Sequence, residues 1–219
     1  MSDFGMTFLS LTDAIANHAK WSANKTAVVC GDQRLTWFAL NRNINRIANG
    51  LRHAGLRPGE KVSVQMANGV PMVEVMLGVL KAGGVIVPLS PLLTAESLSL
   101  MINDSDSRFL FAEAPLHAQV TAIRDQLPQI VDGGFILAGA AAANWRPLAM
   151  FKADASDTEP GVQVSLQDDF NIIYSSGTTG TPKGIVHTHY ARLQFCQMLG
   201  IELRFASTAV AILTTPLYT

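Results

Sequence analysis

The sequence predicts an α/β protein whose mainly parallel sheet is flanked by helices. Between residues 62 and 137, short apolar runs rich in β-branched residues alternate with longer segments of helical periodicity. Such alternation indicates βαβ units, in which helices cover both faces of a parallel sheet. Hydrophobic residues make up 48% of the 219 residues and charged residues only 15%, so a sizeable buried core is expected.

The first part of the chain is expected to form a helix, a hairpin and a second helix. Residues 8–20 carry apolar side chains at helical spacing, and residues 27–30 and 34–36 resemble two short strands joined by a turn. Thr36 is a favourable N-cap, and Gly55 is a natural C-terminal stop. The segment between them should be a helix with its apolar stripe in the core.

A βαβ series is expected next. Pro71 and Thr94 are typical of helix starts, and Gly83-Gly84 is typical of a helix end. The expected strands are 62–66, 85–88, 108–112 and 135–137, and the expected helices are 71–81, 94–103 and 118–126.

Two segments depart from this alternation. Residues 139–169 are rich in alanine and then in acidic residues, and we expect an exposed, mobile connector whose acidic groups are solvated surface. Residues 209–214 form an apolar run that is expected to be a strand, and Thr215–Thr219 follows without a cap. Since natural termini are usually polar, the chain is expected to be an N-terminal fragment.

Composition excludes several classes of function. A formal net charge of −1 argues against nucleic acid as a partner. No stretch approaches the about 20 apolar residues of a membrane span, and the N-terminus does not resemble a signal peptide. Cys30 and Cys196 form no disulfide framework, so we expect a cytoplasmic protein in which both are buried apolar fillers. No His or Cys spacing indicates a metal site.

The most informative stretch is Tyr174–Gly184, Tyr-Ser-Ser-Gly-Thr-Thr-Gly-Thr-Pro-Lys-Gly. Five Ser and Thr hydroxyls, three glycines and one lysine fall within eleven residues. Glycine lets the backbone approach a ligand closely, and hydroxyl, N–H and ammonium groups donate to oxyanions. A polar surface loop is the simpler interpretation of such a cluster, but the composition also suits a loop that binds a polyphosphate.

The stretch does not have Walker A spacing. That motif needs four residues between its glycines and then Gly-Lys-Ser/Thr. Only two residues separate Gly177 from Gly180, Pro182 precedes Lys183, and Gly184 follows it. A P-loop NTPase is therefore disfavoured.

The stretch resembles the signature of the adenylate-forming superfamily, which contains acyl-CoA synthetases, aryl-CoA ligases, luciferases and the adenylation domains of peptide synthetases. The hydrophobic segment 170–174 before the loop and Ile185-Val186-His187-Thr188-His189 after it extend the similarity. Residues 35–37, 55–62 and 80–89 are similar to earlier family motifs, so the resemblance covers residues 8–219.

The resemblance implies part of the N-terminal domain of an adenylate-forming enzyme. Residues 1–50 would belong to a neighbouring α/β subdomain, 51–200 to the subdomain with the phosphate-binding loop, and 201–219 to the return into the neighbouring subdomain. Family members use ATP to convert a carboxylic acid into an acyl-adenylate, and the thiol of coenzyme A then displaces AMP.

The resemblance also implies the ATP contacts. They are Ser175, Ser176, Gly177, Thr178, Thr179, Gly180 and Lys183. One hydrogen bond to a charged group contributes about 1.5–3 kcal/mol, whereas a lysine about 4 Å from a phosphate contributes about 4 kcal/mol before desolvation. The hydroxyls together should therefore outweigh Lys183. The Mg²⁺ ligand, the catalytic residues and most of the acid pocket are expected beyond residue 219.

Two histidines follow the loop, and His187 and His189 are expected to pack rather than to catalyse. Thr219 stands where many family members carry a histidine, which leaves the substrate class open.

The leading interpretation is an acyl- or aryl-CoA synthetase of fatty acid metabolism that acts on a small carboxylic acid. The alternatives are an amino-acid-activating adenylation domain and a non-catalytic phosphate-binding module. The fragment alone is expected to be inactive. It is also expected to form a homo-oligomer, because residues 209–214 and the helix after Thr36 should expose apolar area.

Overall fold

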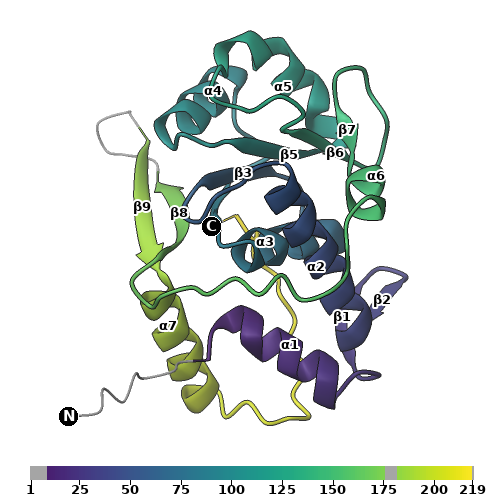
Figure 1. Ribbon diagram of the computed structural model, residues 1–219. Coiled ribbons are helices and arrows are strands. Elements are labelled where there is room, and N and C mark those ends of the chain that lie inside the picture. The colour runs from purple at the N-terminus through teal and green to yellow at the C-terminus, as the bar shows by residue number, and fades with distance from the viewer. Residues whose placement is uncertain (1–8, 176–181, 219) are drawn as a thin grey trace, which may run out of the picture.

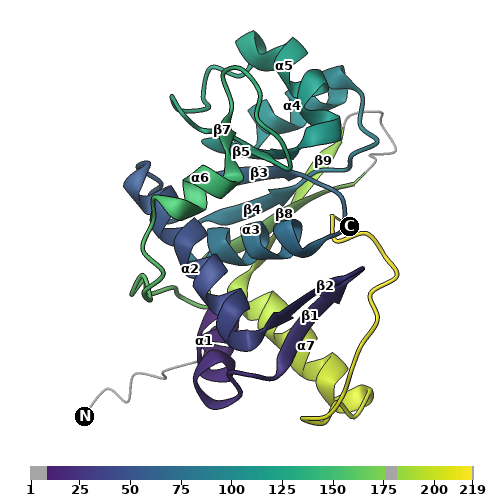
Figure 2. The same cartoon turned by 90° about the vertical axis from the view of Figure 1, so that its right-hand side faces the viewer.

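The computed structural model describes residues 9–175 and 182–218. A seven-stranded sheet with the order β7-β6-β5-β3-β4-β8-β9 forms its centre, and the hairpin of β1 and β2 lies to one side (Figures 1 and 2). Neighbouring strands of the large sheet are parallel except for β8 and β9, which are antiparallel. The predicted fold class is confirmed.

The described strands are β1 (Thr26–Cys30), β2 (Gln33–Thr36), β3 (Lys61–Gln65), β4 (Val85–Pro88), β5 (Phe109–Glu113), β6 (Phe135–Ala138), β7 (Arg146–Pro147), β8 (Asp169–Ser175) and β9 (Lys183–Thr188). The described α-helices are α1 (Leu11–Trp21), α2 (Trp37–His53), α3 (Val70–Lys81), α4 (Ala95–Asp104), α5 (His117–Ile123), α6 (Leu148–Ala153) and α7 (His189–Glu202).

Local sequence explains where these helices begin. The Ser10 hydroxyl accepts a hydrogen bond from the amide of Asp13, whose carboxylate accepts one from the Ser10 amide, so α1 starts with a capping box. Thr36, Thr94 and Thr188 cap α2, α4 and α7 through their side-chain oxygens. The predicted N-caps Thr36 and Thr94 are thus confirmed.

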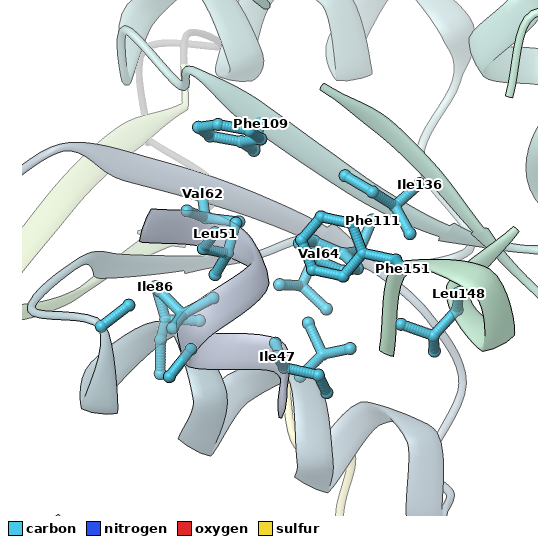
Figure 3. Close-up of a cluster of buried hydrophobic side chains, with 14 of the residues drawn as sticks. Ile47, Leu51, Val62, Val64, Ile86, Phe109, Phe111, Ile136, Leu148 and Phe151 are labelled. Atoms are coloured by element: carbon cyan, nitrogen blue, oxygen red, sulfur yellow. The ribbon is translucent and has the colours of Figure 1, made fainter. Parts of the chain in front are cut away.

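Alternate residues of the strands face two separate apolar layers. Figure 3 shows one layer, in which Ile47 of α2 and Phe151 of α6 pack against Val62, Val64 and Phe111 of the sheet. The other layer lies under α4 and α5 and contains Val85, Val87, Leu110, Ala112 and Leu137 from β4, β5 and β6. The sheet is therefore buried on both faces, as a parallel sheet requires.

Helices α2 and α3 approach each other closely because of a glycine. A Cβ atom on Gly78 of α3 would lie 2.5 Å from Cγ2 of Ile47 on α2. A larger residue at this position would force the two helices apart. Leu40, Ile44, Ile47 and Leu51 of α2 are buried, whereas Phe38 is 50% exposed. The expectation that this helix exposes its apolar stripe is therefore wrong beyond its first turn.

The connector before β8, residues 139–169, makes more contacts with the rest of the protein than the sequence predicted. It contains β7 and α6, and its residues 154–161 run along the polar side of α2. Asp157 forms salt bridges with Arg42 and Arg46, so the prediction that the acidic groups are only solvated surface is wrong. Carbonyls of 156, 157, 158 and 160 accept hydrogen bonds from Asn45, Asn49 and Arg52.

Lys81 is buried where α2, α3 and the connector residues 154–161 meet. Its ammonium group lies 2.6 Å from Oε2 of Glu159 and 2.7 Å from Oδ1 of Asn41, and its side chain is only 6% exposed. Oε1 of Glu159 accepts further hydrogen bonds from Asn41 and Asn45. A buried charge is tolerated when it is paired in this way, so α2, α3 and the connector are joined at one point.

Two other predictions are wrong. Residues 209–214 form no strand in the described part of the chain, and Val210 is 92% exposed. Cys30 and Cys196 are both exposed rather than buried. In each case the residues are apolar, but no described element lies over them.

Replacing Lys81 with methionine should destabilise the protein. The apolar stem is retained, while Asn41 and Glu159 each lose a partner, which costs on the order of 1–3 kcal/mol for buried polar groups left unpaired. Chemical denaturation should show this loss, whereas the exposed Lys20→Met control should change the unfolding free energy by less than about 0.5 kcal/mol. An unfolding free energy that is unchanged in Lys81→Met would contradict the stabilising role of the Lys81–Glu159 pair.

The contribution of the Glu159 carboxylate to the stability of the fold should depend on pH. Burial alone would raise its pKa, but hydrogen bonds from Lys81, Asn41 and Asn45 outweigh burial and lower the pKa below its usual 4.5. The stabilisation is therefore present above pH 4.5 and is lost as the pH falls through the lowered pKa. The difference in melting temperature between the unaltered chain and Glu159→Gln should be largest near neutrality and shrink on acidification. A pH-independent difference would rule this out.

Candidate nucleotide-binding site

The predicted loop joins β8 to β9 at the carboxyl edge of the sheet. β8 runs parallel to β4, so Ser175 lies on the same edge as the ends of β3, β4 and β5 (Figures 1 and 2). Open α/β sheets bind their ligands outside the carboxyl ends of the strands. Ser176, Gly177, Thr178, Thr179 and Gly180 lie outside the described residues. Of the predicted set, the structure therefore places Ser175 and Lys183.

Ser175 and Lys183 are brought together by strand pairing. They are opposite each other in the antiparallel register of β8 and β9, and directly opposed residues point to the same face. Both are exposed. Among residues 9–175 and 182–218, Lys183 takes part in no salt bridge.

Tyr174 occupies the opposite face of the hairpin. Its hydroxyl lies 2.5 Å from Oδ2 of Asp104 and 3.2 Å from the carbonyl oxygen of Met101, both on α4. A Cβ atom on Gly184, the cross-strand partner of Tyr174, would lie 2.9 Å from Cγ2 of Ile172 and 3.3 Å from the tyrosine ring. The final glycine of Pro-Lys-Gly is therefore required by close packing.

His189, which follows the loop, has a packing role. His189 begins α7, is buried, and its ring packs edge-on against Phe170 at 5.1 Å between centroids. Its amide donates to the carbonyl of Asp168 at 2.9 Å. Burial lowers the pKa of His189, partly opposed by Asp168, and burial and Arg192 lower the pKa of His187. Both rings are thus favoured as neutral groups.

A cavity of about 260 Å³ lies between α7 and β8, on the face that carries Ser175. Its walls are mainly apolar and include Ile173, Phe195 and Leu217. Arg192 also lines it, with Nε 3.3 Å from Oδ1 of Asn171 and a terminal nitrogen 3.4 Å from Nδ1 of His187. The polar groups of the cavity are therefore partly engaged with one another.

Sequence reasoning missed Asn68. Its amide nitrogen donates to the carbonyl of Thr215 at 2.9 Å, and its amide oxygen accepts from the Leu217 amide at 2.9 Å. These bonds hold residues 215–218 at the same sheet edge as Ser175. The available signal was a polar residue at or just beyond the carboxyl end of a buried strand. Glu113, the last residue of β5, is a second example, and its carboxylate accepts a hydrogen bond from the Ala67 amide.

Metal and membrane features are absent from the described part of the chain. Across residues 9–175 and 182–218, no three His, Cys, Asp or Glu side chains gather as metal ligands would. In the same ranges, every helix is too short or too polar to cross a bilayer.

The chain is similar to ligases and to peptide synthetases. Fatty acid–[acyl-carrier-protein] ligase ScoC of Streptomyces coeruleorubidus is 33% identical over 82% of this chain and 33% of its own length. Feruloyl-CoA synthase of Amycolatopsis sp is 33% identical over 91% of this chain and 38% of its own. Bacitracin synthase 1 of Bacillus licheniformis is also 33% identical, over 81% of this chain and 3% of its own. The chain spans about a third of the length of the first two.

Solved structures show the same arrangement. The anthranilate CoA ligase AuaEII in complex with anthranoyl-AMP superposes with a TM-score of 0.83 at 25% identity, over 89% of this chain and 38% of that one. A protein from Rhodopseudomonas palustris CGA009, at 22% identity and a TM-score of 0.87 over 95% of this chain and 52% of that one, shares the fold. The model of the AMP-binding enzyme family matches residues 15–219, and the chain belongs to that family.

Proposed function

We propose that this chain supplies part of the ATP site of an AMP-forming acid–thiol ligase, an acyl- or aryl-CoA synthetase. The observation that carries the proposal is the placement of Ser175 and Lys183, side by side at the carboxyl edge of a fold that matches the family over residues 15–219. The names of ScoC, feruloyl-CoA synthase and the anthranilate CoA ligase all describe the joining of a carboxylic acid to a thiol carrier.

The proposed reaction has two steps. A carboxylate oxygen of a small acid attacks the α-phosphorus of ATP, the bond from that phosphorus to the bridging oxygen breaks, and pyrophosphate leaves. The thiol sulfur of coenzyme A then attacks the acyl carbon, and AMP leaves with the electron pair of the broken C–O bond. Negative charge grows on pyrophosphate in the first step, so donors around it stabilise the transition state.

The chain's own residues would bind the leaving phosphates. Ser175 and Lys183 approach the ligand from the two ends of the loop, and Ser176, Gly177, Thr178, Thr179 and Gly180 complete the set. Several hydroxyl and amide donors outweigh one ammonium group, since each hydrogen bond to a charged group contributes about 1.5–3 kcal/mol. Mg²⁺, the catalytic groups and most of the acid pocket are assigned to residues outside this chain.

An amino-acid-activating adenylation domain is the second candidate. Bacitracin synthase 1 is as similar to this chain as the two ligases are, at 33% identity. The two functions differ in the acyl acceptor, which is coenzyme A in one and the thiol of a carrier protein in the other. A carrier-protein domain downstream of residue 219 would favour the second candidate.

The organisation and setting are part of the same proposal. We divide the chain into residues 1–50 and 201–219, which belong to a neighbouring subdomain, and residues 51–200, which carry the loop. The exposed thiols of Cys30 and Cys196 suit a reducing compartment, and we place the protein in the cytoplasm. Its metabolic role would be the activation of fatty or aromatic acids.

Replacing Thr178 and Thr179 together with alanine should weaken ATP use. In the ligase that contains this chain, the double variant should raise KM for ATP and lower kcat, because part of the lost stabilisation exists only in the transition state. Lys183→Ala should act in the same direction but more mildly. Steady-state kinetics measure both, and Thr121→Val is a remote threonine control. Unchanged ATP kinetics in the double variant would refute the proposed site.

The isolated chain should self-associate. Side chains of α7 and the following segment expose large apolar groups, including Ile201, Phe205, Val210 and Ile212. Large exposed apolar patches promote association. Light scattering should therefore give a dimer or larger species, and replacing Val210 and Ile212 with serine should shift the mass toward the monomer. A monomer at high concentration before any substitution would contradict this expectation.

A further inference from the structure

The loop end of β8 lies beyond the point at which this strand pairs with β4. The ladder between β4 and β8 has a single recorded register position among the described residues, Ile86 with Asn171, near the start of β8. Beyond that point, β8 pairs with β9, which is the edge strand. The end of the hairpin that bears Ser175 and Lys183 is therefore open to a further contact from outside this ladder.

Tyr174 supplies an attachment on the face opposite to these two residues. Ile172 belongs to the apolar layer under α4 and α5, and the half-buried Tyr174 ring packs against the same layer. Asn171 and Ile173 instead line the cavity beside α7. Since side chains alternate along a strand, Ser175 shares the face of Ile173 and not that of Tyr174.

The Tyr174 hydroxyl donates a hydrogen bond to the C-terminal turn of α4. Its one proton faces two acceptors, and the Asp104 carboxylate oxygen, at 2.5 Å, is the closer. Hydrogen bonds to an ionised acceptor are shorter and stronger than neutral ones. Burial, and then the Asp104 carboxylate, raise the pKa of Tyr174 above its usual 10.0, so the hydroxyl remains a donor at neutral pH.

The partner strand is shaped to accept the ring. Gly184 lies opposite Tyr174, and any side chain there would meet the ring and Ile172. One tyrosine thus contacts β9 through its ring and α4 through its hydroxyl. It joins both strands of the hairpin to a helix of the core.

We propose that Tyr174 is a positioning residue for the phosphates of ATP. Through its hydrogen bond to Asp104 it holds the base of the hairpin against α4, so that Ser175 and Lys183 present their side chains on the opposite face. The ligand part of this inference rests on the proposed function. The mechanical part concerns the hairpin alone and has its own readout.

The experiment uses two readouts on the 219-residue chain. Isothermal titration with inorganic tripolyphosphate measures affinity, and amide hydrogen exchange measures the protection of residues 174–175 and 183–184. Tyr174→Phe keeps the ring and removes the hydroxyl, and Asp104→Ala removes the acceptor. Each should weaken tripolyphosphate binding about tenfold, equivalent to about 1.4 kcal/mol, and each should speed exchange at the hairpin end.

A double-variant cycle separates positioning from general destabilisation. Because Tyr174→Phe and Asp104→Ala break the same bond, the double variant should bind no more weakly than either single variant. Asp104→Asn retains an acceptor oxygen and should restore affinity to within about twofold of the unaltered chain. Thr121→Val is the matched control. It removes the acceptor of the Trp145 indole N–H, an aromatic side-chain hydrogen bond in the same apolar layer, and should leave both readouts unchanged.

The outcomes are distinguishable. Additive losses in the double variant, or unchanged exchange and affinity in Tyr174→Phe, would overturn the positioning role. If the unaltered chain binds no tripolyphosphate, the proposal that this chain binds phosphates is refuted. The exchange measurement then still decides whether Tyr174 holds the hairpin.

Discussion

The antiparallel pairing of β8 with β9 is the interaction on which the candidate site depends. Every other strand pair of the large sheet is parallel. Parallel strands need long crossover connections, whereas an antiparallel pair can be joined by a short loop. The reversal at the end of the sheet therefore allows a glycine-rich loop of seven residues to return directly, with Ser175 and Lys183 at its two ends on one face.

The hairpin is in turn positioned by contacts on both sides. Tyr174 reaches α4 on one face, and on the other Arg192 of α7 contacts Asn171 of β8 and His187 of β9. The connector that enters β8 also caps α7, because the amide of His189 donates to the carbonyl of Asp168. The loop is thus placed by a core helix, by the helix that follows it and by the segment that precedes it.

Much of the fold could be predicted from local sequence. Thr36 and Thr94 indicated where their helices begin. The hydroxyl oxygen of an N-cap residue accepts a hydrogen bond from an amide in the first turn of its own helix, so the signal is local. The apolar runs of β4 and β5 were recognisable because strands buried on both faces carry few polar residues. The candidate site was recognised from the similarity of residues 174–184 to a family signature, because composition alone also fits an ordinary polar loop.

Long-range polar contacts could not be predicted. Asn41, Asn45 and Asn49 recur at helical spacing and look like a solvent face, yet they donate to a connector more than 100 residues away. In the sequence, Lys81 looks like an ordinary exposed lysine at the end of a helix. In the structure, it is buried and pairs with Glu159. Nothing local distinguishes a polar side chain that meets water from one that meets a distant carboxylate.

The sequence alone therefore determined the order of helices and strands, the two-faced burial of the sheet and the chemical character of the loop. These follow from caps, periodicity and residue type, which act over a few neighbouring residues. Only the tertiary structure decided that Ser175 lies opposite Lys183, that the Tyr174 hydroxyl bonds to Asp104 and that Asn68 holds residues 215–218 at the same edge. Each of these depends on strand register and on contacts between residues far apart in the chain, which a local pattern does not encode.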